Sequence, residues 1–399
     1  MKKMMIYNGF SHIMPELVVW MIYLKINGWS VAEIALVQGL FTLFSTFFEL
    51  PSGIIADRFG RKRTLQIGEI FCVLYLLTFF FPTNHTLIAI GMFLFAIGLS
   101  LISGADVSLL YNIVEKESPK NYLKYVGRFN AIGILAMALG NLSGGIIANT
   151  SWKLLFVFAI SLRLISFIII SRVKEVKVEV DLKDIGVINQ FNLILSFFEK
   201  RKTFILLLVC TSLSIAAITS SYQFAPVIFE NMNLSTVDIS IIFGVISVLG
   251  AIFAFLPDKL SAFISSKSII SLSLCIAMLM FLLIALFPNT IFLVIISIII
   301  PNILFEAWNV ILDTFIQEQV TDNIRSSIFS ILNLVASLAI TLISFIVSMF
   351  SNKLSLIYII SLTSCFLLSI SLISFIIFNW TNKNSKHRMV SCKEINTKI

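Results

Sequence analysis

The stretch Gly53-Ile54-Ile55-Ala56-Asp57-Arg58-Phe59-Gly60-Arg61-Lys62-Arg63-Thr64-Leu65 lies between two long apolar runs and decides how the chain folds. Gly53 and Gly60 permit close backbone approach or a positive φ, and Asp57 offers a carboxylate at a helix end. Charged side chains at this density cannot lie in hydrocarbon, where each costs about 2.5–3.5 kcal/mol. The stretch therefore predicts a tight loop at a membrane face. Its cations are Arg58, Arg61, Lys62 and Arg63.

The composition is that of an integral membrane protein. Of 399 residues, 58% are hydrophobic and 13% are charged, and the mean hydropathy is +0.99; about 25% of a typical soluble domain is charged. Only helices or closed barrels can span a bilayer, and these apolar runs are too long and continuous for barrel strands. We therefore predict an all-α membrane fold. The five cysteines have no spacing typical of a metal or redox site, so no metal or cofactor is expected.

Apolar runs of about 20 residues predict twelve spanning helices. They lie near residues 4–24, 31–56, 65–82, 86–110, 127–149, 152–171, 203–224, 237–256, 267–288, 290–313, 326–350 and 354–379.

Between the sixth and seventh runs the composition becomes polar and charged. We predict a cytoplasmic linker at 172–202 that separates two six-helix bundles, 1–171 and 203–379, and a cytoplasmic tail at 380–399. The second part of the linker has apolar residues at three- and four-residue steps, which predicts an amphipathic helix on the inner leaflet. These residues are Ile188, Phe191, Leu195 and Phe198.

Lysine and arginine gather in alternate connections. If the even-numbered connections are cytoplasmic, the opposite side holds only Lys25, Lys153 and Lys353. This asymmetry places both termini in the cytoplasm of a bacterial-type plasma membrane. The net charge of +8 then reflects membrane topology, and no nucleic-acid partner is needed to explain it.

The order of residues 53–63 resembles the loop between the second and third helices of the major facilitator superfamily, G-x-L-A-D-R-x-G-R-K-R, with Ile55 in place of the leucine. A second stretch is similar to the family's fifth-helix signature, which is associated with its antiporter branches; Asn141 stands where the signature has proline. The resemblance implies a twelve-helix secondary transporter that works as a monomer by alternating access. The residues of this second stretch are Gly133, Gly140, Asn141, Gly144 and Gly145.

In the family, the acidic residue and the cations of this loop pair with charges and helix ends across the two halves. The resemblance assigns that role to Asp57, Arg58, Arg61 and Arg63. Glu49 lies just before the loop, and we interpret it, with Asp57, as part of the same cytoplasmic gate. The fourth span lacks the arginine that many proton-coupled members carry near 93–98.

Glu16 falls inside the first predicted span, Asp106 inside the fourth and Glu306 inside the tenth. Ionisable groups within spans usually face a bundle interior or a water-filled cavity. In the family, helices one, four, seven and ten line the central cavity. The resemblance therefore implies that all three carboxylates face the transport path.

Two further residues extend this set. His12 precedes Glu16 by four residues, so we expect the two to share one helix face and exchange a hydrogen bond or a proton; the alternative is a neutral Glu16 that serves only in packing. Arg163 lies near the middle of the sixth span and cannot lose its proton. It is expected to pair with Asp106 or Glu16, or to contact an anionic substrate.

These observations predict proton-coupled efflux of drugs or small amphipathic metabolites, with the solute, H⁺ and lipid as partners. An importer of the same fold, which moves proton and solute in the same direction, is the alternative. A membrane receptor or lipid-modifying enzyme is a remote third reading. The sequence contains no Gly-Lys-Ser/Thr nucleotide loop, catalytic triad or metal-ligand cluster, so we expect neither an enzyme nor ATP-driven transport.

Overall fold

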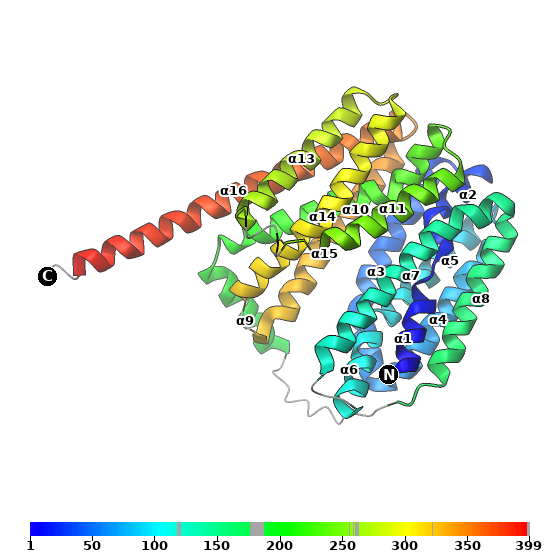
Figure 1. The fold of residues 1–399 in the computed structure, drawn as a ribbon, viewed down its shortest axis with the longest axis horizontal. Helices are drawn as coiled ribbons and strands as arrows, with labels where there is room; N and C mark the ends of the chain where they lie inside the picture. The colour runs from blue at the N-terminus through cyan, green and yellow to red at the C-terminus, as the bar shows by residue number, and fades with distance from the viewer. Residues whose placement is uncertain are drawn as a thin grey trace. The chain divides into compact units, whose positions relative to one another are not determined.

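A computed structural model describes residues 1–117, 121–175, 187–254, 256–257, 259, 263–320 and 322–396. These residues form helices and short connections, and no strand occurs among them. Packing divides the chain into two compact units (Figure 1). Unit 1 comprises Met1–Asp181, Tyr222–Ala251 and Ile340–Ile359; unit 2 comprises Leu182–Ser221, Ile252–Ala339 and Ile360–Ile399.

Unit 1 contains the first half of the chain. Within it α4 packs against α5 and α8, α3 packs against α5, and α1 packs against α7 and α8 (Figure 1). Its complete helices are α1 (Lys2–His12), the 3₁₀ helix η1 (Pro15–Val18), α2 (Trp20–Ile26), α3 (Val31–Phe59), α4 (Arg61–Thr78), α5 (His85–Ile102), α6 (Ala105–Glu117), α7 (Tyr122–Thr150) and α8 (Trp152–Ser171).

Unit 2 contains three complete helices, of which α13 packs along α14. They are α9 (Val187–Lys200), α13 (Ser266–Leu286) and α14 (Ile291–Gln319). Four long helices belong partly to each unit, namely α10 (Phe204–Asn231), α11 (Thr236–Ala254), α15 (Asp322–Phe350) and α16 (Leu356–Asn396).

Helices cover every one of the twelve predicted spans. In the described part of the chain, ten helices are long and apolar enough to cross a membrane. The remaining two spans are the first, which is broken into short pieces, and α4, which carries four charged residues. The chain is thus an all-α, multi-pass membrane protein, as predicted.

The prediction of one continuous first helix at 4–24 is wrong. α1 ends at His12, Ile13 and Met14 leave the helical conformation, and η1 starts at Pro15. Pro15 has no N–H to donate, and its ring disfavours helical backbone angles at Met14. The proline therefore breaks the helix in the middle of the predicted span.

Two other helix boundaries differ from the prediction, and a glycine with positive φ lies at each of them. α3 runs to Phe59 and α4 starts at Arg61, so the expected loop is reduced to Gly60 with φ +93°. The fourth span is interrupted at Ser103–Gly104, where Gly104 has φ +80°, and α6 continues it to Glu117. A glycine takes such angles without the strain that a Cβ would cause.

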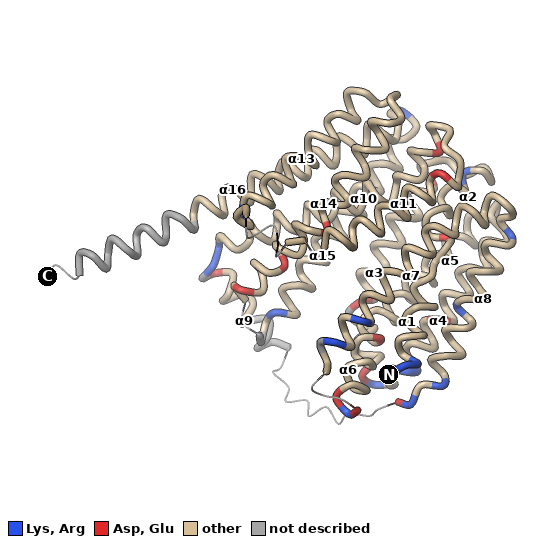
Figure 2. Tube along the Cα trace, in the orientation of Figure 1, with Lys and Arg blue, Asp and Glu red and all other residues tan. Residues whose placement is uncertain are grey.

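A helix is found in the predicted amphipathic part of the linker, α9, but residues 176–186 lie outside the described ranges. Its place on the inner leaflet stays a prediction. α16 continues past the predicted end of the last span to Asn396. In unit 1, many Lys and Arg positions gather at the end of the helices where the chain begins (Figure 2).

Candidate functional site

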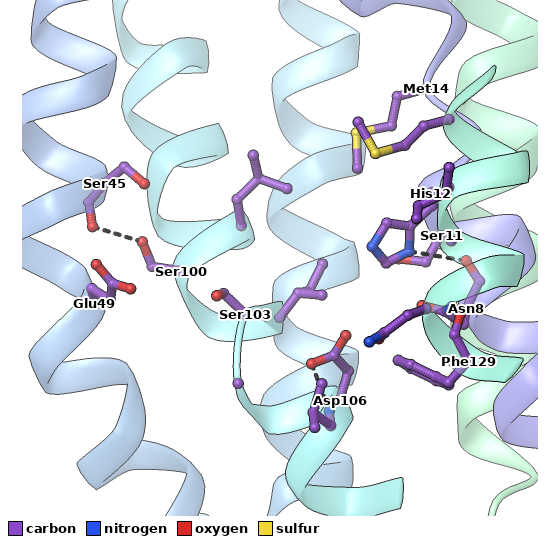
Figure 3. Close-up of a pocket in the computed structure, with 18 residues that line it drawn as sticks. Asn8, Ser11, His12, Met14, Ser45, Glu49, Ser100, Ser103, Asp106 and Phe129 are labelled. Carbon is purple, nitrogen blue, oxygen red and sulfur yellow. Dashed lines mark hydrogen bonds between the residues drawn. The ribbon is translucent and has the colours of Figure 1, made fainter. Parts of the chain in front are cut away.

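A cavity of about 700 Å³ lies among the helices of unit 1. Its walls come from α1, α3, α5, α6 and α7, together with the connection at Ser103–Gly104. We call it the N-terminal cavity. The side chains used in the following argument are Asn8, Ser11, His12, Glu49, Ser100 and Asp106 (Figure 3).

Asp106 and His12 lie on neighbouring parts of the cavity wall. Asp106 is 7% exposed, and its Oδ1 accepts a hydrogen bond from the Val107 N–H at 2.6 Å. The His12 ring interacts electrostatically with this carboxylate. The Nδ1 of His12 lies 2.9 Å from the Asn8 carbonyl oxygen. The break after Gly104 starts α6 one residue before Asp106, so the carboxylate lies at a helix N-terminus, a position that favours negative charge.

Glu49 also lines the N-terminal cavity, on the wall opposite His12 in Figure 3. Its side chain is exposed, and Ser100, beside it, donates to the Ser45 carbonyl oxygen at 3.0 Å. Glu49 lies within α3, ten residues before that helix ends at Phe59. Its role in a cytoplasmic gate stays a prediction.

Asn8 supplies a polar group on the α1 side of the cavity. It is 1% exposed, and its Nδ2 donates to the Phe129 carbonyl oxygen of α7 at 2.6 Å. Its Oδ1 has no hydrogen-bond partner among the described residues. A buried acceptor without a partner is costly, so this atom is suited to a donor from a bound solute or water.

Arg163 pairs with a residue that the sequence analysis overlooked, Glu69 of α4. The Nη1 of Arg163 lies 3.3 Å from Glu69 Oε2, and the two side chains are 2% and 0% exposed. Ser11 donates to Glu69 Oε1 at 2.8 Å. Of the two predicted partners, Glu16 interacts electrostatically with Arg163. The hydrogen-bonded partner is Glu69, which reaches the guanidinium because α4 packs along α8.

Glu16 is buried, at 1% exposure, and is not among the residues that line the N-terminal cavity. It interacts electrostatically with Arg163, and its Oε2 has no hydrogen-bond partner among the described residues. Since the helix breaks between His12 and Glu16, these two residues do not share a face of one helix. We refer to Glu16, Glu69 and Arg163 as the buried charge cluster.

The glycines predicted to form a fifth-helix motif lie on α7 where other backbone comes close. A Cβ on Gly140 would lie 2.8 Å from Met14 N, and one on Gly144 would overlap the Pro15 carbonyl oxygen. Gly133 faces Asn8 and His12. Because these three glycines have no side chain, the broken part of the first span can pack closely against α7.

The end of the same motif contacts α11 and α10 within unit 1. The Gly145 N–H donates to Ser240 Oγ at 2.6 Å, and a Cβ there would overlap the Thr236 carbonyl oxygen. Asn141, in place of the proline, donates through Nδ2 to Ser247 Oγ at 2.9 Å and to the Tyr222 hydroxyl at 3.2 Å.

At the loop stretch, Arg61 ties two helices together. Its Nη1 donates to the Ser108 carbonyl oxygen of α6 at 2.8 Å, and its Nη2 lies 3.9 Å from Asp57 Oδ1. Gly53 lies within α3 in open space. Arg58 and Arg63 are exposed and Lys62 is half-buried. The role of this stretch as a gate stays a prediction.

In unit 2, α14 carries the third predicted carboxylate, Glu306, which is exposed. Asp313, seven residues further and on the same helix face, is half-buried and was overlooked in the sequence analysis. Both overlooked acids, Glu69 and Asp313, lie inside predicted spans. The rule that identified Glu16 and Asp106 would have found them if it had been applied to every span.

A family model described as Major Facilitator Superfamily matches residues 4–344. Among curated proteins, an uncharacterised MFS-type transporter of Methanocaldococcus jannaschii, MJ1560, is 24% identical over 264 residues, which is 63% of this chain and 65% of that protein. The alignments span between about a third and two thirds of the length of the curated relatives.

Solved structures resemble the chain over nearly its whole length. The nucleoside transporter NupG has a TM-score of 0.76 at 14% identity, over 96% of this chain and 98% of that chain. A D-xylose–proton symporter has a TM-score of 0.72 at 15% identity, over 94% of this chain and 95% of that chain. At these identities the likeness concerns the fold.

Proposed function

Because the chain belongs to the Major Facilitator Superfamily, we propose that it is a proton-coupled secondary transporter that exports cationic or amphipathic solutes. Transport proceeds by alternating access around a site near the middle of the membrane. The N-terminal cavity of unit 1 belongs to that site. The chain acts as a monomer in a bacterial-type plasma membrane with both termini in the cytoplasm.

One observation supports this proposal most strongly, the acidic lining of the N-terminal cavity. Asp106 and Glu49 both line it, and the described lining residues include no Lys or Arg. The volume of about 700 Å³ falls within the usual range for small-molecule sites, about 300–1,000 Å³. Two carboxylates in a largely apolar cavity favour a solute that carries positive charge and apolar surface.

The preference for export rests on the α7 glycine stretch and its resemblance to the antiporter signature. In an antiporter, inward movement of protons drives outward movement of the solute. Asp106 is the residue proposed to contact the cationic solute, since it is nearly buried and faces the cavity.

The experiment uses inverted membrane vesicles, energised to be acidic inside, and follows uptake of the fluorescent cation ethidium. Wild type is compared with Asp106→Asn and with Asp238→Asn, a matched control whose carboxylate accepts a hydrogen bond from Ser235 at the start of α11. Export predicts uptake that is lost with an uncoupler and in Asp106→Asn but kept in Asp238→Asn. If only right-side-out vesicles accumulate a solute when acidic outside, the importer reading replaces this proposal.

A further inference from the structure

The buried charge cluster has an odd number of charges. Glu16 and Glu69 are two carboxyl groups, and Arg163 is the one cation that interacts with both. All three side chains are at most 2% exposed. If both acids were ionised, the cluster would keep one uncompensated negative charge away from water.

Among the described residues, Arg163 is the only cation that acts on the groups of the cluster. Cys72 lies within electrostatic range of all three members, and Tyr75 lies within range of Glu16 and Arg163. Tyr7, on α1, interacts with Glu69 and with Asp106. The titratable groups described around the cluster are thus Tyr7 of α1 and Cys72 and Tyr75 of α4, and none of the three is cationic.

Glu69 and Glu16 differ in their hydrogen bonds. Glu69 accepts a hydrogen bond from Arg163 Nη1 on Oε2 at 3.3 Å and one from Ser11 Oγ on Oε1 at 2.8 Å. A carboxylate with donors on both oxygens is stabilised in its charged form. Glu16 has an oxygen, Oε2, with no partner among the described residues, which is costly for a buried carboxylate and less so for a neutral acid.

The cluster also has one direct connection to the N-terminal cavity. Ser11 lines that cavity, donates to Glu69, and lies 3.4 Å from Arg163 Nη1. The same hydroxyl therefore borders both the water-accessible cavity and the ion pair.

We propose that the cluster of Glu16, Glu69 and Arg163 is a single proton-binding site, that Glu16 holds the proton, and that Ser11 is its connection to the N-terminal cavity. The inference rests on the proposed proton coupling and assigns the driving proton to this site, apart from the carboxylates that contact the solute. Binding transfers one proton from solvent to a Glu16 carboxylate oxygen, and release returns it.

Infrared spectroscopy of the purified protein in lipid tests the site without any solute. A protonated carboxyl group has a C=O stretch that is separate from the carboxylate bands. Glu16→Gln is expected to remove the signal of one protonated carboxyl group at neutral pH. Glu69→Gln is expected to remove it as well, because Glu16 then ionises to compensate Arg163. Arg163→Gln is expected to double it, because neither acid keeps a cation.

The response to Glu69→Gln carries the test even if Arg163→Gln fails to fold, since the glutamine has the shape of the acid it replaces. A signal that survives either Glu16→Gln or Glu69→Gln overturns the proposal. Because no transport is measured, these outcomes are independent of whether the chain exports a solute.

The connection through Ser11 is tested by exchange into D₂O, which shifts the same C=O stretch. Ser11→Ala is expected to slow this exchange at least tenfold. Ser161→Ala is the control, because Ser161 donates within its own helix, to the Phe158 carbonyl oxygen at 2.6 Å. Equal exchange rates in Ser11→Ala and wild type would show that the proton reaches Glu16 by another route.

Discussion

α1 borders two groups of charged residues whose surroundings differ, the buried charge cluster and the carboxylates of the N-terminal cavity. On one side, Glu69 and Arg163 are excluded from solvent and bonded to each other. On the other side, Asp106 and Glu49 line a cavity whose described walls include no Lys or Arg. Paired charges that are excluded from solvent stabilise one packing of the helices, whereas carboxylates that line a cavity can be reached by a solute that enters it. The comparison separates two kinds of ionisable residue in the spans, those paired inside the helix packing and those that line a cavity.

The largest effect is expected on the buried side. Arg163→Met should destabilise the protein by about 3–5 kcal/mol, because it leaves a buried carboxylate without its partner. The double variant Glu69→Leu/Arg163→Met should recover most of that loss, since it removes both charges of the pair. Unfolding of the detergent-solubilised protein measures both. A double variant as unstable as Arg163→Met would show that Glu69 and Arg163 do not depend on each other for stability.

The contact between α7 and the break in the first span comes next. Gly144→Ala should cost about 1–3 kcal/mol, because the new Cβ overlaps the Pro15 carbonyl oxygen in a packed region. Gly127→Ala, in the same helix, meets nothing within 4 Å and should be neutral or slightly stabilising. The melting temperatures of the two variants check the difference. Similar values would mean that the break can move away from α7.

A smaller effect is expected at the cavity wall. Asn8→Ala removes the hydrogen bond to the Phe129 carbonyl oxygen and should cost about 0.5–1.5 kcal/mol. Asn130→Ala, at an exposed position of the same cavity, should change the free energy of unfolding by less than about 0.5 kcal/mol. Thermal unfolding of the Asn8→Ala and Asn130→Ala proteins measures the two changes. If the two asparagines prove equivalent, burial on this side of α1 does not govern stability.

The smallest effect on stability, with a clear effect on binding, is expected at Glu49. Glu49→Gln should change the free energy of unfolding by less than about 0.5 kcal/mol, because the side chain is exposed. Loss of its charge should weaken binding of an organic cation about tenfold, which corresponds to about 1.4 kcal/mol. Titration with ethidium measures the affinity. An unchanged affinity would remove Glu49 from the solute site.

The sequence was sufficient for the all-α membrane fold and for the places of the apolar helices, because hydrophobic length is a local property. It was sufficient also for Gly60, whose positive φ follows from its place between two helices. The break at Pro15 was equally readable, since proline disfavours helix at the preceding residue. The apolar run continues through Pro15 and therefore suggested one helix. The predicted His12–Glu16 pair required that helix to be continuous.

The partner of Arg163 could not be predicted in the same way. Glu69 and Arg163 are 94 residues apart, and only the packing of α4 against α8 brings them together. The position of Glu49 likewise depends on how α3 lies against α5. Long-range neighbours are decided by helix packing, which the apolar periodicity of each helix does not specify.

The most direct test of the account compares two modes of transport for Glu16→Gln and Asp106→Asn in proteoliposomes. One mode is ethidium accumulation driven by a pH gradient, and the other is exchange of labelled for unlabelled ethidium without a gradient. If the driving proton and the solute use different sides of α1, Glu16→Gln should lose accumulation and keep exchange, whereas Asp106→Asn should lose both. Loss of exchange in Glu16→Gln, or full accumulation by that variant, would contradict the account.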